Sequence, residues 1–398
     1  MKRWWLLALP LVLLASCNNA NSSSSSSINS NSSVSTSSNS TSSSSSSSSF
    51  VHKTNYGIAP IFDDPLGIYD KDPSIFEENG KRYVFYTTNE KSFESGDVIG
   101  LRIGEKDENR YRYSDAKIVL RPSENKWDSV RVSNPDVIKG TFKYEESEYS
   151  YLMAYQGNSK VKDRLYEIGF AVSNDLENWI KVGDKAVINY SSYALGSAYG
   201  CGAPSLVSFD KKGKLYCFYT YADALITSTR VAYFDCTDLN DIKSNEPSAL
   251  SSHGLQDKNA DVVFNNADFV IDKEKESIYV VRDRNPVMSM PATSDSIQIA
   301  KANLNILTNP FDYQWEIIYS AISDLDTAVL DSDDPNQEFG WERIYSPCFI
   351  SNPYGELISF KQKVAFSVSA VGNRGDTQYI FTPAIVEYDV ELYVEREI

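Results

Sequence analysis

Polar side chains recur in a short segment that appears five times along the chain. The first copy is Asp72-Pro73-Ser74-Ile75-Phe76, and each later copy also ends in two apolar residues. Because side chains alternate along a β-strand, the first and third residues of each copy should share one face. The first residues are Asp72, Asn134, Ala203, Asn266 and Ser346, and the third residues are Ser74, Asp136, Ser205, Asp268 and Cys348. This polarity favours a solvent-filled functional surface; the alternative is a set of solvated strand ends.

The elements that carry these residues are short strands. Each copy is followed by a polar turn and a second expected strand, at 81–88, 149–157, 214–222, 277–284 and 356–366. Alternating runs of Tyr, Val, Ile and Phe fill the rest of 50–398 and are typical of an all-β domain. The copies are 62, 69, 63 and 80 residues apart, which predicts a five-bladed β-propeller. The two polar sets would then form two rings around its axis, the second deeper than the first.

Three stretches of this repeat resemble a known group of enzymes. DPSIFEENGKRYVFYTT (72–88), GFAVSNDLENWIKVG (169–183) and GAPSLVSFDKKGKLYCFYTYA (202–222) are similar to blade segments of glycoside hydrolase family 43 and related arabinanases, β-xylosidases and fructosidases. The resemblance covers 50–398 and implies a five-bladed propeller that hydrolyses glycosidic bonds. The stretch from Ser173 to Trp179 is the most distinctive part, and we interpret it as a hairpin tip with Trp179 packed on the blade.

Such hydrolysis needs two carboxyl groups, one to protonate the leaving oxygen and one to activate water or attack the sugar. The resemblance implies an Asp base on blade 1, an orienting Asp on blade 2 and a Glu acid on blade 3. Asp72 matches the base in its Asp-Pro context, whereas Asn134 and Gly202 stand at the other two positions. We therefore expect Asp136 to orient or tune Asp72. Glu342 is the expected proton donor, with a salt bridge to a nearby Arg as its alternative role.

Two Trp/Arg pairs precede axial strands and are candidate sugar-binding residues. Trp127 and Arg131 lie seven and three residues before Asn134, and Trp341 and Arg343 lie five and three residues before Ser346. Tryptophan faces stack on sugar C–H surfaces, and arginine binds carboxylates or neighbouring hydroxyls. Asn134 and Asp268 complete the predicted substrate-binding set. The alternative is that each Trp is wedged between blades and covered by its Arg.

The first 49 residues are not expected to be part of the fold. Lys2 and Arg3 precede an apolar stretch too short to span a bilayer, and 14–17 read Leu-Ala-Ser-Cys, like a bacterial lipobox. We predict a signal peptide at 1–16, lipidation of Cys17 and a flexible Ser/Asn-rich tether over 17–49, with the propeller at 50–398. A secretory signal with a chance cysteine is the alternative. The protein would then be extracytoplasmic, anchored to a bacterial membrane by its lipid.

Composition narrows the remaining function classes. A net charge of -16 argues against nucleic-acid binding, and two histidines leave little scope for a His-rich metal site. No cofactor is expected. Asp331 and Asp333 lie in an acidic loop that could bind calcium, although a solvated turn is favoured. The pairing of Cys201, Cys217, Cys236 and Cys348 is left open, as disulfides or free thiols.

We expect a surface-anchored, monomeric glycoside hydrolase that acts on oligo- or polysaccharide at the axis. A non-catalytic glycan-binding lipoprotein that lost the usual acid is the main alternative. A protein-binding adhesin is less favoured, because the polarity is concentrated at the axis.

Overall fold

The structure is a computed structural model of the whole chain. The described residues are 70–89, 96–108, 110–159, 165–190, 199–223, 226–255, 266–284, 294, 296–310, 314–323, 343–369 and 384–393. The chain divides into two compact units, Met1–His52 and Lys53–Ile398, and every described residue belongs to the second. No helix within these ranges has the length and apolar character needed to cross a membrane.

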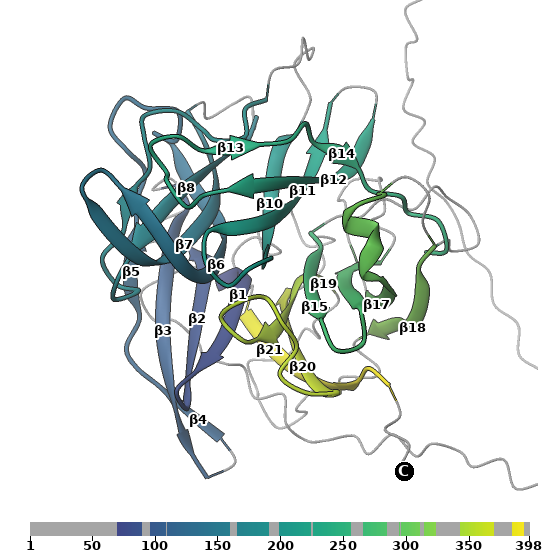
Figure 1. Cartoon of the computed structure of the whole chain (residues 1–398). Coiled ribbons are helices and arrows are strands. Elements are labelled where there is room, and N and C mark those ends of the chain that lie inside the picture. The colour runs from purple at the N-terminus through teal and green to yellow at the C-terminus, as the bar shows by residue number, and fades with distance from the viewer. Residues whose placement is uncertain are drawn as a thin grey trace, which may run out of the picture. The chain divides into compact units, whose positions relative to one another are not determined.

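The strands form five antiparallel blades (Figure 1). Blade 1 contains β1 (Asp70–Glu78), β2 (Lys81–Thr88), β3 (Val98–Asp107), β4 (Arg110–Tyr113) and β5 (Lys117–Leu120). Blade 2 contains β6 (Arg131–Tyr144), β7 (Ser147–Asn158), β8 (Glu167–Ser173) and β9 (Ile180–Lys181). Blade 3 contains β10 (Gly200–Ser208), β11 (Lys214–Ala222), β12 (Thr227–Asp235), β13 (Lys243–Ser244) and β14 (Ser248–Ala249). Blade 4 contains β15 (Asp268–Asp272), β16 (Ser277–Asp283), β17 (Ser296–Asn303) and β18 (Glu316–Ser323), and blade 5 contains β19 (Arg343–Ser351), β20 (Lys361–Ser369) and β21 (Ala384–Glu391).

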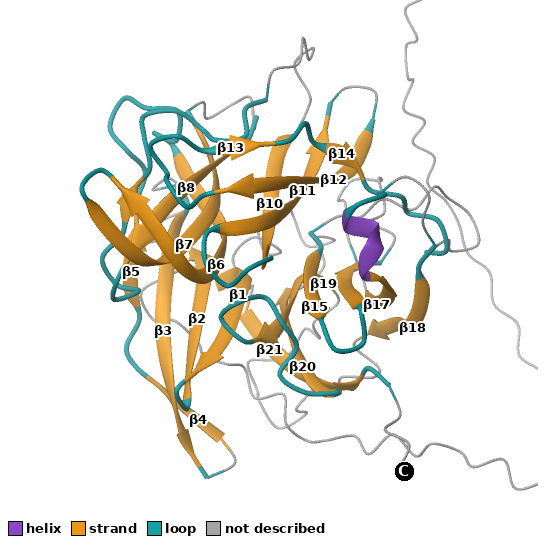
Figure 2. Ribbon diagram, viewed as in Figure 1, coloured by secondary structure: helices purple, strands orange, loops and turns teal. Residues whose placement is uncertain are grey.

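This architecture confirms the five-bladed β-propeller predicted from the repeat. Each repeated segment begins the first strand of a blade, and the expected second strand pairs with it in antiparallel register. Figure 2 shows that the described residues are almost entirely strand and loop, with one short 3₁₀ helix at Leu304–Leu307.

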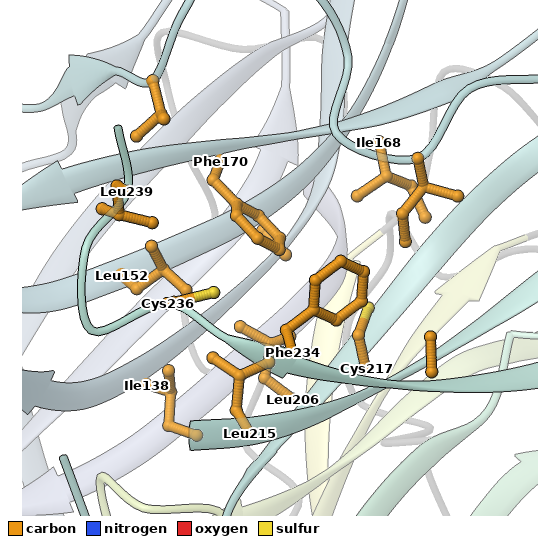
Figure 3. Packing of buried hydrophobic residues seen from close by; sticks show 14 of the residues in the cluster. Ile138, Leu152, Ile168, Phe170, Leu206, Leu215, Cys217, Phe234, Cys236 and Leu239 are labelled. Atoms are coloured by element: carbon orange, nitrogen blue, oxygen red, sulfur yellow. The ribbon is translucent and has the colours of Figure 1, made fainter. Parts of the chain in front are cut away.

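The core lies between the blades as five apolar clusters, one for each pair of neighbours. Figure 3 shows the cluster between blades 2 and 3, where Phe170 of β8 packs edge-on against Phe234 of β12. Cys217 and Cys236 lie among these hydrocarbon side chains. Cys201, Cys217, Cys236 and Cys348 are all free and buried, and burial raises the pKa of each thiol. The sulfur atoms therefore contribute as small apolar groups.

The hairpin tip at 173–179 also contributes to inter-blade packing. Asp175 accepts hydrogen bonds from the backbone N–H groups of Glu177 (2.9 Å) and Asn178 (2.7 Å), which closes the turn. The ring of Trp179 meets Phe85 of blade 1 edge-on, with centroids 5.9 Å apart. The packing role predicted for this motif is confirmed.

The ring is closed by direct pairing between its first and last blades. β1 runs parallel to β19, with Ile75 opposite Ile350. Beside this junction Arg82, which is 2% exposed, is ion-paired with Glu77 of β1 (2.6 Å) and with Glu387 of β21. The guanidinium therefore links both blades at the point where the chain completes its circle.

A tight turn closes one end of the axis. This turn, residues 352–356 between β19 and β20, is hereafter called the plug. Its carbonyl groups accept hydrogen bonds from three other blades: Lys139 N–H to Pro353 O (2.6 Å), Ser208 N–H to Tyr354 O (3.0 Å) and Ile271 N–H to Gly355 O (3.0 Å). Glu356 adds ion pairs to Lys211 (2.7 Å) and Lys273 (3.0 Å). Among the described residues, no comparable turn covers the axial space at the other end, where the first strands begin, and this end is hereafter called the open end.

Candidate active site

The open end is lined by a backbone irregularity that all five blades share. The first residues of the repeat, hereafter the rim, have left-handed φ angles of 54° at Asp72, 46° at Asn134, 47° at Ala203, 44° at Asn266 and 47° at Ser346. Non-glycine residues rarely adopt this region, and each instance costs about 1–3 kcal/mol. In four blades the strand pairing shifts at this point, as at a β-bulge. Since the strain recurs at one level of the axis, it belongs to the shape of the axial strands and not to one side chain.

In four of the five blades, the rim residue is held by a hydrogen bond to the preceding blade. The backbone N–H groups donate as follows: Asp72 to Ser367 Oγ (2.9 Å), Asn134 to Thr87 Oγ1 (2.8 Å), Ala203 to Gln156 Oε1 (2.9 Å) and Ser346 to Asp283 Oδ1 (2.8 Å). Every acceptor lies near the end of the second strand of the preceding blade. These bonds offset the bulges and fix the blades around the axis.

The rim encloses a small polar cavity that continues down the axis. Its volume is about 40 Å³, and all five rim residues line it together with Ser74, Asp136, Asp268 and Cys348. The predicted convergence on the axis is therefore observed for every member of the two sets except Ser205, whose hydroxyl donates a hydrogen bond to Asp268. This volume suits a few water molecules. A second cavity of about 10 Å³ lies below it, against Gly355 of the plug.

Asp72 presents its carboxylate in this cavity wall. The side chain is 7% exposed; its Oδ1 accepts a hydrogen bond from Ser346 Oγ at 2.6 Å, and its Oδ2 lies 3.2 Å from Lys71 Nζ. Ser346 comes from blade 5, so the carboxylate is positioned across the closing junction. Lys71 supplies a nearby positive charge that balances the carboxylate. Sequence reasoning missed both partners, although Lys71 is the residue next to Asp72.

Asp136 lies below the rim and connects three blades. Its Oδ1 accepts hydrogen bonds from Ser74 Oγ (2.7 Å) and from the backbone N–H of Val137 (3.1 Å), and its Oδ2 accepts one from the N–H of Leu206. These partners belong to blades 1, 2 and 3. The hydrogen bonds give Asp136 a structural role at the axis, and the orienting or tuning of Asp72 that we expected from the sequence stays a prediction.

Asp268 repeats this arrangement on the other side of the axis. It accepts hydrogen bonds from Ser205 Oγ (2.7 Å) of blade 3 and from the N–H of Phe349 (2.8 Å) of blade 5. Burial raises the pKa of Asp136 to about 8, helped by the charge of Asp268, and burial raises the pKa of Asp268 to about 6. The two acids thus retain protons at a pH where ordinary carboxyl groups are ionised.

The place expected for a blade 3 acid is filled by other side chains. A Cβ on Gly202 would lie 2.2 Å from Gln156 Oε1 and 2.6 Å from the hydroxyl of Tyr199. Tyr199 donates a hydrogen bond to Gln156 Oε1 at 2.8 Å, and Gln156 Nε2 donates to Ser133 Oγ at 3.0 Å. Glycine is required at this position because the Gln156 amide and the Tyr199 phenol fill the space that a side chain would need.

Trp127 is placed in blade packing. Its ring stacks on Tyr155 with centroids 5.5 Å apart, and its atoms lie 2.9 Å and 2.3 Å from the positions that a Cβ would take at Gly157 and Gly169. Glycines on β7 and β8 therefore make room for the indole. Of the two roles considered for this residue, the structure shows packing against the blade.

The other predicted residues are placed only in part. Arg131 begins β6, and its stem passes Gly96, which has a φ of 76°. Arg343 begins β19 and pairs with Ser369. The predicted residues Cys17, Asp331, Asp333, Trp341 and Glu342 lie outside the described residues. Across the described ranges, no group of three or more His, Cys, Asp or Glu side chains is arranged to hold a metal ion.

Comparison with known proteins supports the fold. No protein family profile and no curated protein matches the sequence. Among solved structures, a family 117 glycoside hydrolase of Zobellia galactanivorans is similar, with a TM-score of 0.54 and 14% identity over 85% of this chain and 90% of that one. The catalytic domain of a GH62 α-L-arabinofuranosidase of Coprinopsis cinerea is also similar, with a TM-score of 0.52 and 10% identity over 83% of this chain and 95% of that one. At such identities the likeness is one of fold.

Proposed function

We propose that this protein is a glycoside hydrolase that acts on oligo- or polysaccharide at the open end of its propeller axis. The observation that carries the proposal is the Asp72 carboxylate, held at the rim by Ser346 and Lys71. Glycoside hydrolases are also among the solved structures that share this fold. Because the axial cavity of about 40 Å³ suits only water, we place the sugar above the rim, with water beneath it.

In this scheme Asp72 is the general base. Its carboxylate takes a proton from a water molecule as that water adds to the anomeric carbon, while a second group protonates the leaving oxygen. The hydrogen bond from Ser346 fixes the orientation of the carboxylate. We assign the acid role to Glu342, which comes four residues before Ser346 in the chain. The neutral acids Asp136 and Asp268 keep the axis below the rim free of further negative charge at moderately acidic pH.

The test is Asp72→Asn, assayed on a panel of pentose, fructose and uronic-acid oligosaccharides and on aryl glycosides. Asparagine tolerates the left-handed φ of this position, so the variant should fold and bind like the wild type. Turnover should fall by about 10²- to 10⁴-fold, as expected for loss of a general base. Glu342→Gln should impair natural substrates far more than aryl glycosides, whose leaving groups need no protonation. Full activity of Asp72→Asn would exclude it as the base.

A non-catalytic glycan-binding protein is the second candidate. The observation that favours it is the Gln156–Tyr199 network beside Gly202, where related enzymes are expected to carry their acid. If the wild type binds a glycan, as shown by a raised melting temperature, but cleaves neither natural nor aryl substrates, this candidate replaces the enzyme.

We further propose that the protein is extracytoplasmic and anchored through a lipid on Cys17. The lipobox-like sequence and the Ser/Asn-rich stretch that follows it support this proposal. Cys17→Ala should release the protein from the membrane fraction or stall its processing, and unchanged partitioning and mobility would count against the anchor.

A further inference from the structure

An arginine between blades 2 and 3 lies outside the catalytic scheme. Arg230 of β12 pairs with Tyr219 of β11, and its guanidinium carbon lies 3.7 Å from the centroid of the Tyr221 ring. Tyr219 is the neighbour of Thr220, which pairs with Gly202, and Gly202 is the neighbour of the rim residue Ala203. Arg230 therefore lies at about the height of the rim. Arg230 is partly exposed. A guanidinium stacked on an aromatic face keeps its N–H edge available for planar anions.

Three polar atoms around this ring have no hydrogen-bond partner. They are Arg230 Nε, Ser228 Oγ and Tyr190 Oη, and all three are screened from solvent. Ser228 lies opposite Tyr221 in the β11–β12 ladder, and the Tyr190 and Tyr221 rings are 5.9 Å apart. Unsatisfied buried polar atoms are costly, and a native site that collects several of them calls for an explanation.

The nearby carboxyl groups accept hydrogen bonds from uncharged donors and are not among the ion pairs of the described residues. Glu167 accepts a hydrogen bond from the backbone N–H of Tyr190 (3.1 Å), and Asp223 accepts one from the Tyr221 hydroxyl (3.1 Å). In the part of the chain that the structure describes, Arg230 has no ion pair, whereas Arg82 and Arg112 each contact a carboxylate. Among the described residues, Arg230 therefore has no carboxylate within salt-bridge distance, and its side chain hydrogen-bonds Tyr219, in a protein whose net charge is -16.

We propose that Arg230, with Tyr190, Tyr221 and Ser228, forms a subsite for the carboxylate of an acidic sugar residue in the glycan. The proposal rests on the proposed function, because it places this residue next to the sugar held above the rim. β12 is two strands away from the axial strand β10. At the usual strand spacing, the distance between these two strands is roughly 10 Å. The guanidinium fork matches a carboxylate, and the Ser228 and Tyr190 hydroxyls can donate to the same oxygens, while the Tyr221 ring supports the guanidinium. The favoured ligand class is therefore a uronic-acid oligosaccharide.

The test compares short uronic-acid oligosaccharides with their methyl esters, which keep the sugar but lose the charge. Binding to the full chain is measured by calorimetry at low and at physiological salt. The wild type should bind the acid at least about 10-fold more tightly than the ester, and added salt should reduce that preference. Arg230→Gln should remove the preference and leave ester binding unchanged, and Arg230→Lys should restore only part of it.

The matched control is Arg112→Gln, which removes one positive charge from an exposed ion pair on blade 1. It should keep the acid-over-ester preference, which separates a local contact from a general change in net charge. The melting temperature of each variant establishes that it is folded. A sulfated oligosaccharide serves as a further arm, and a preference for sulfate over carboxylate would overturn the uronate assignment.

Two other results would overturn the subsite. One is equal binding of acid and ester by the wild type, and the other is an equal loss of both ligands in Arg230→Gln. If the wild type binds no acidic oligosaccharide but hydrolyses a neutral one in an Asp72-dependent way, the subsite is wrong and the proposed function stands. If the wild type neither binds nor hydrolyses any oligosaccharide of the panel, both the subsite and the proposed function are wrong.

Discussion

The two ends of the propeller axis are built from opposite kinds of contact. At the open end, each blade contributes one rim residue with a left-handed backbone, and in four of the five blades side chains of the preceding blade hold the N–H group of that residue. At the other end, one turn from blade 5 supplies carbonyl groups to blades 2, 3 and 4. The rim therefore displays side chains around a polar cavity, whereas the plug covers the axis with backbone. This difference teaches that the blades accept backbone strain where their side chains line the axial cavity, and that backbone hydrogen bonds suffice where the axis is only closed.

The largest expected effect comes from disturbing the plug. Gly355 has a φ of 70°, and a Cβ there would lie 2.7 Å from the carbonyl oxygen of Leu206. Gly355→Ala should therefore combine backbone strain with a clash against another blade and cost about 3 kcal/mol of unfolding free energy. Unfolding by urea measures this loss of unfolding free energy.

Gly80→Ala is the matched control, because Gly80 has a φ of 76° and nothing within 4 Å of the added Cβ. It should cost only the strain, about 1 kcal/mol. If the two variants lose equal amounts of unfolding free energy, the predicted clash between the added Cβ at position 355 and the Leu206 carbonyl is wrong.

A smaller effect should come from the acids below the rim. Because the folded-state pKa values of Asp136 and Asp268 are raised, the folded protein retains protons that the unfolded chain releases as the pH rises from about 4. This contribution is fully present below the unfolded pKa and is lost as the pH rises through the folded values of about 6 and about 8. Stability should fall across this window by up to about 1.4 kcal/mol per pH unit for each retained proton.

Unfolding by urea at pH 5, 6.5 and 8 checks this dependence. Asp136→Asn and Asp268→Asn each remove one titrating group and should flatten the decline, while lowering stability through the lost inter-blade hydrogen bonds. A decline that persists unchanged in the double variant would assign it to other groups.

The smallest effect is expected at Glu356 of the plug, with the opposite pH dependence. Burial raises its pKa, but hydrogen bonds from Lys211, Asn352 and Lys273 outweigh burial and lower the pKa below its ordinary value. Its contribution is therefore present above the unfolded pKa and is lost as the pH falls through the folded one. Glu356→Gln should cost about 1 kcal/mol at neutral pH and less in high salt. Glu105→Gln, in the exposed pair with Lys81, should show no measurable change; a comparable loss there would make the plug ion pairs ordinary surface pairs.

Much of the framework could be predicted from local sequence patterns. The repeat identified the first strand of every blade, and the alternation of side chains placed Asp72, Asp136 and Asp268 on the axis, as observed. The packing of Trp179 followed from its turn motif. These features depend on neighbours a few residues apart, so the sequence alone carries them.

Other features of the site depend on contacts between distant parts of the chain. Tyr199 and Gln156, which fill the space beside Gly202, are 43 residues apart, and Ser346, which orients Asp72, is 274 residues away from it. The packing position of Trp127 depends on glycines in two other strands.

By itself, the sequence determined the number of blades, the order of their strands and the polar character of the axis, because these follow from a repeat and from a period of two along each strand. Only the tertiary structure decided that the rim adopts left-handed angles, that Gln156 and Tyr199 fill the space beside Gly202, and that Arg230 has no ion pair among the described residues. Those outcomes depend on which side chains of neighbouring strands and blades come into contact. The closure of the ring determines these contacts, and the local spacing of residues does not.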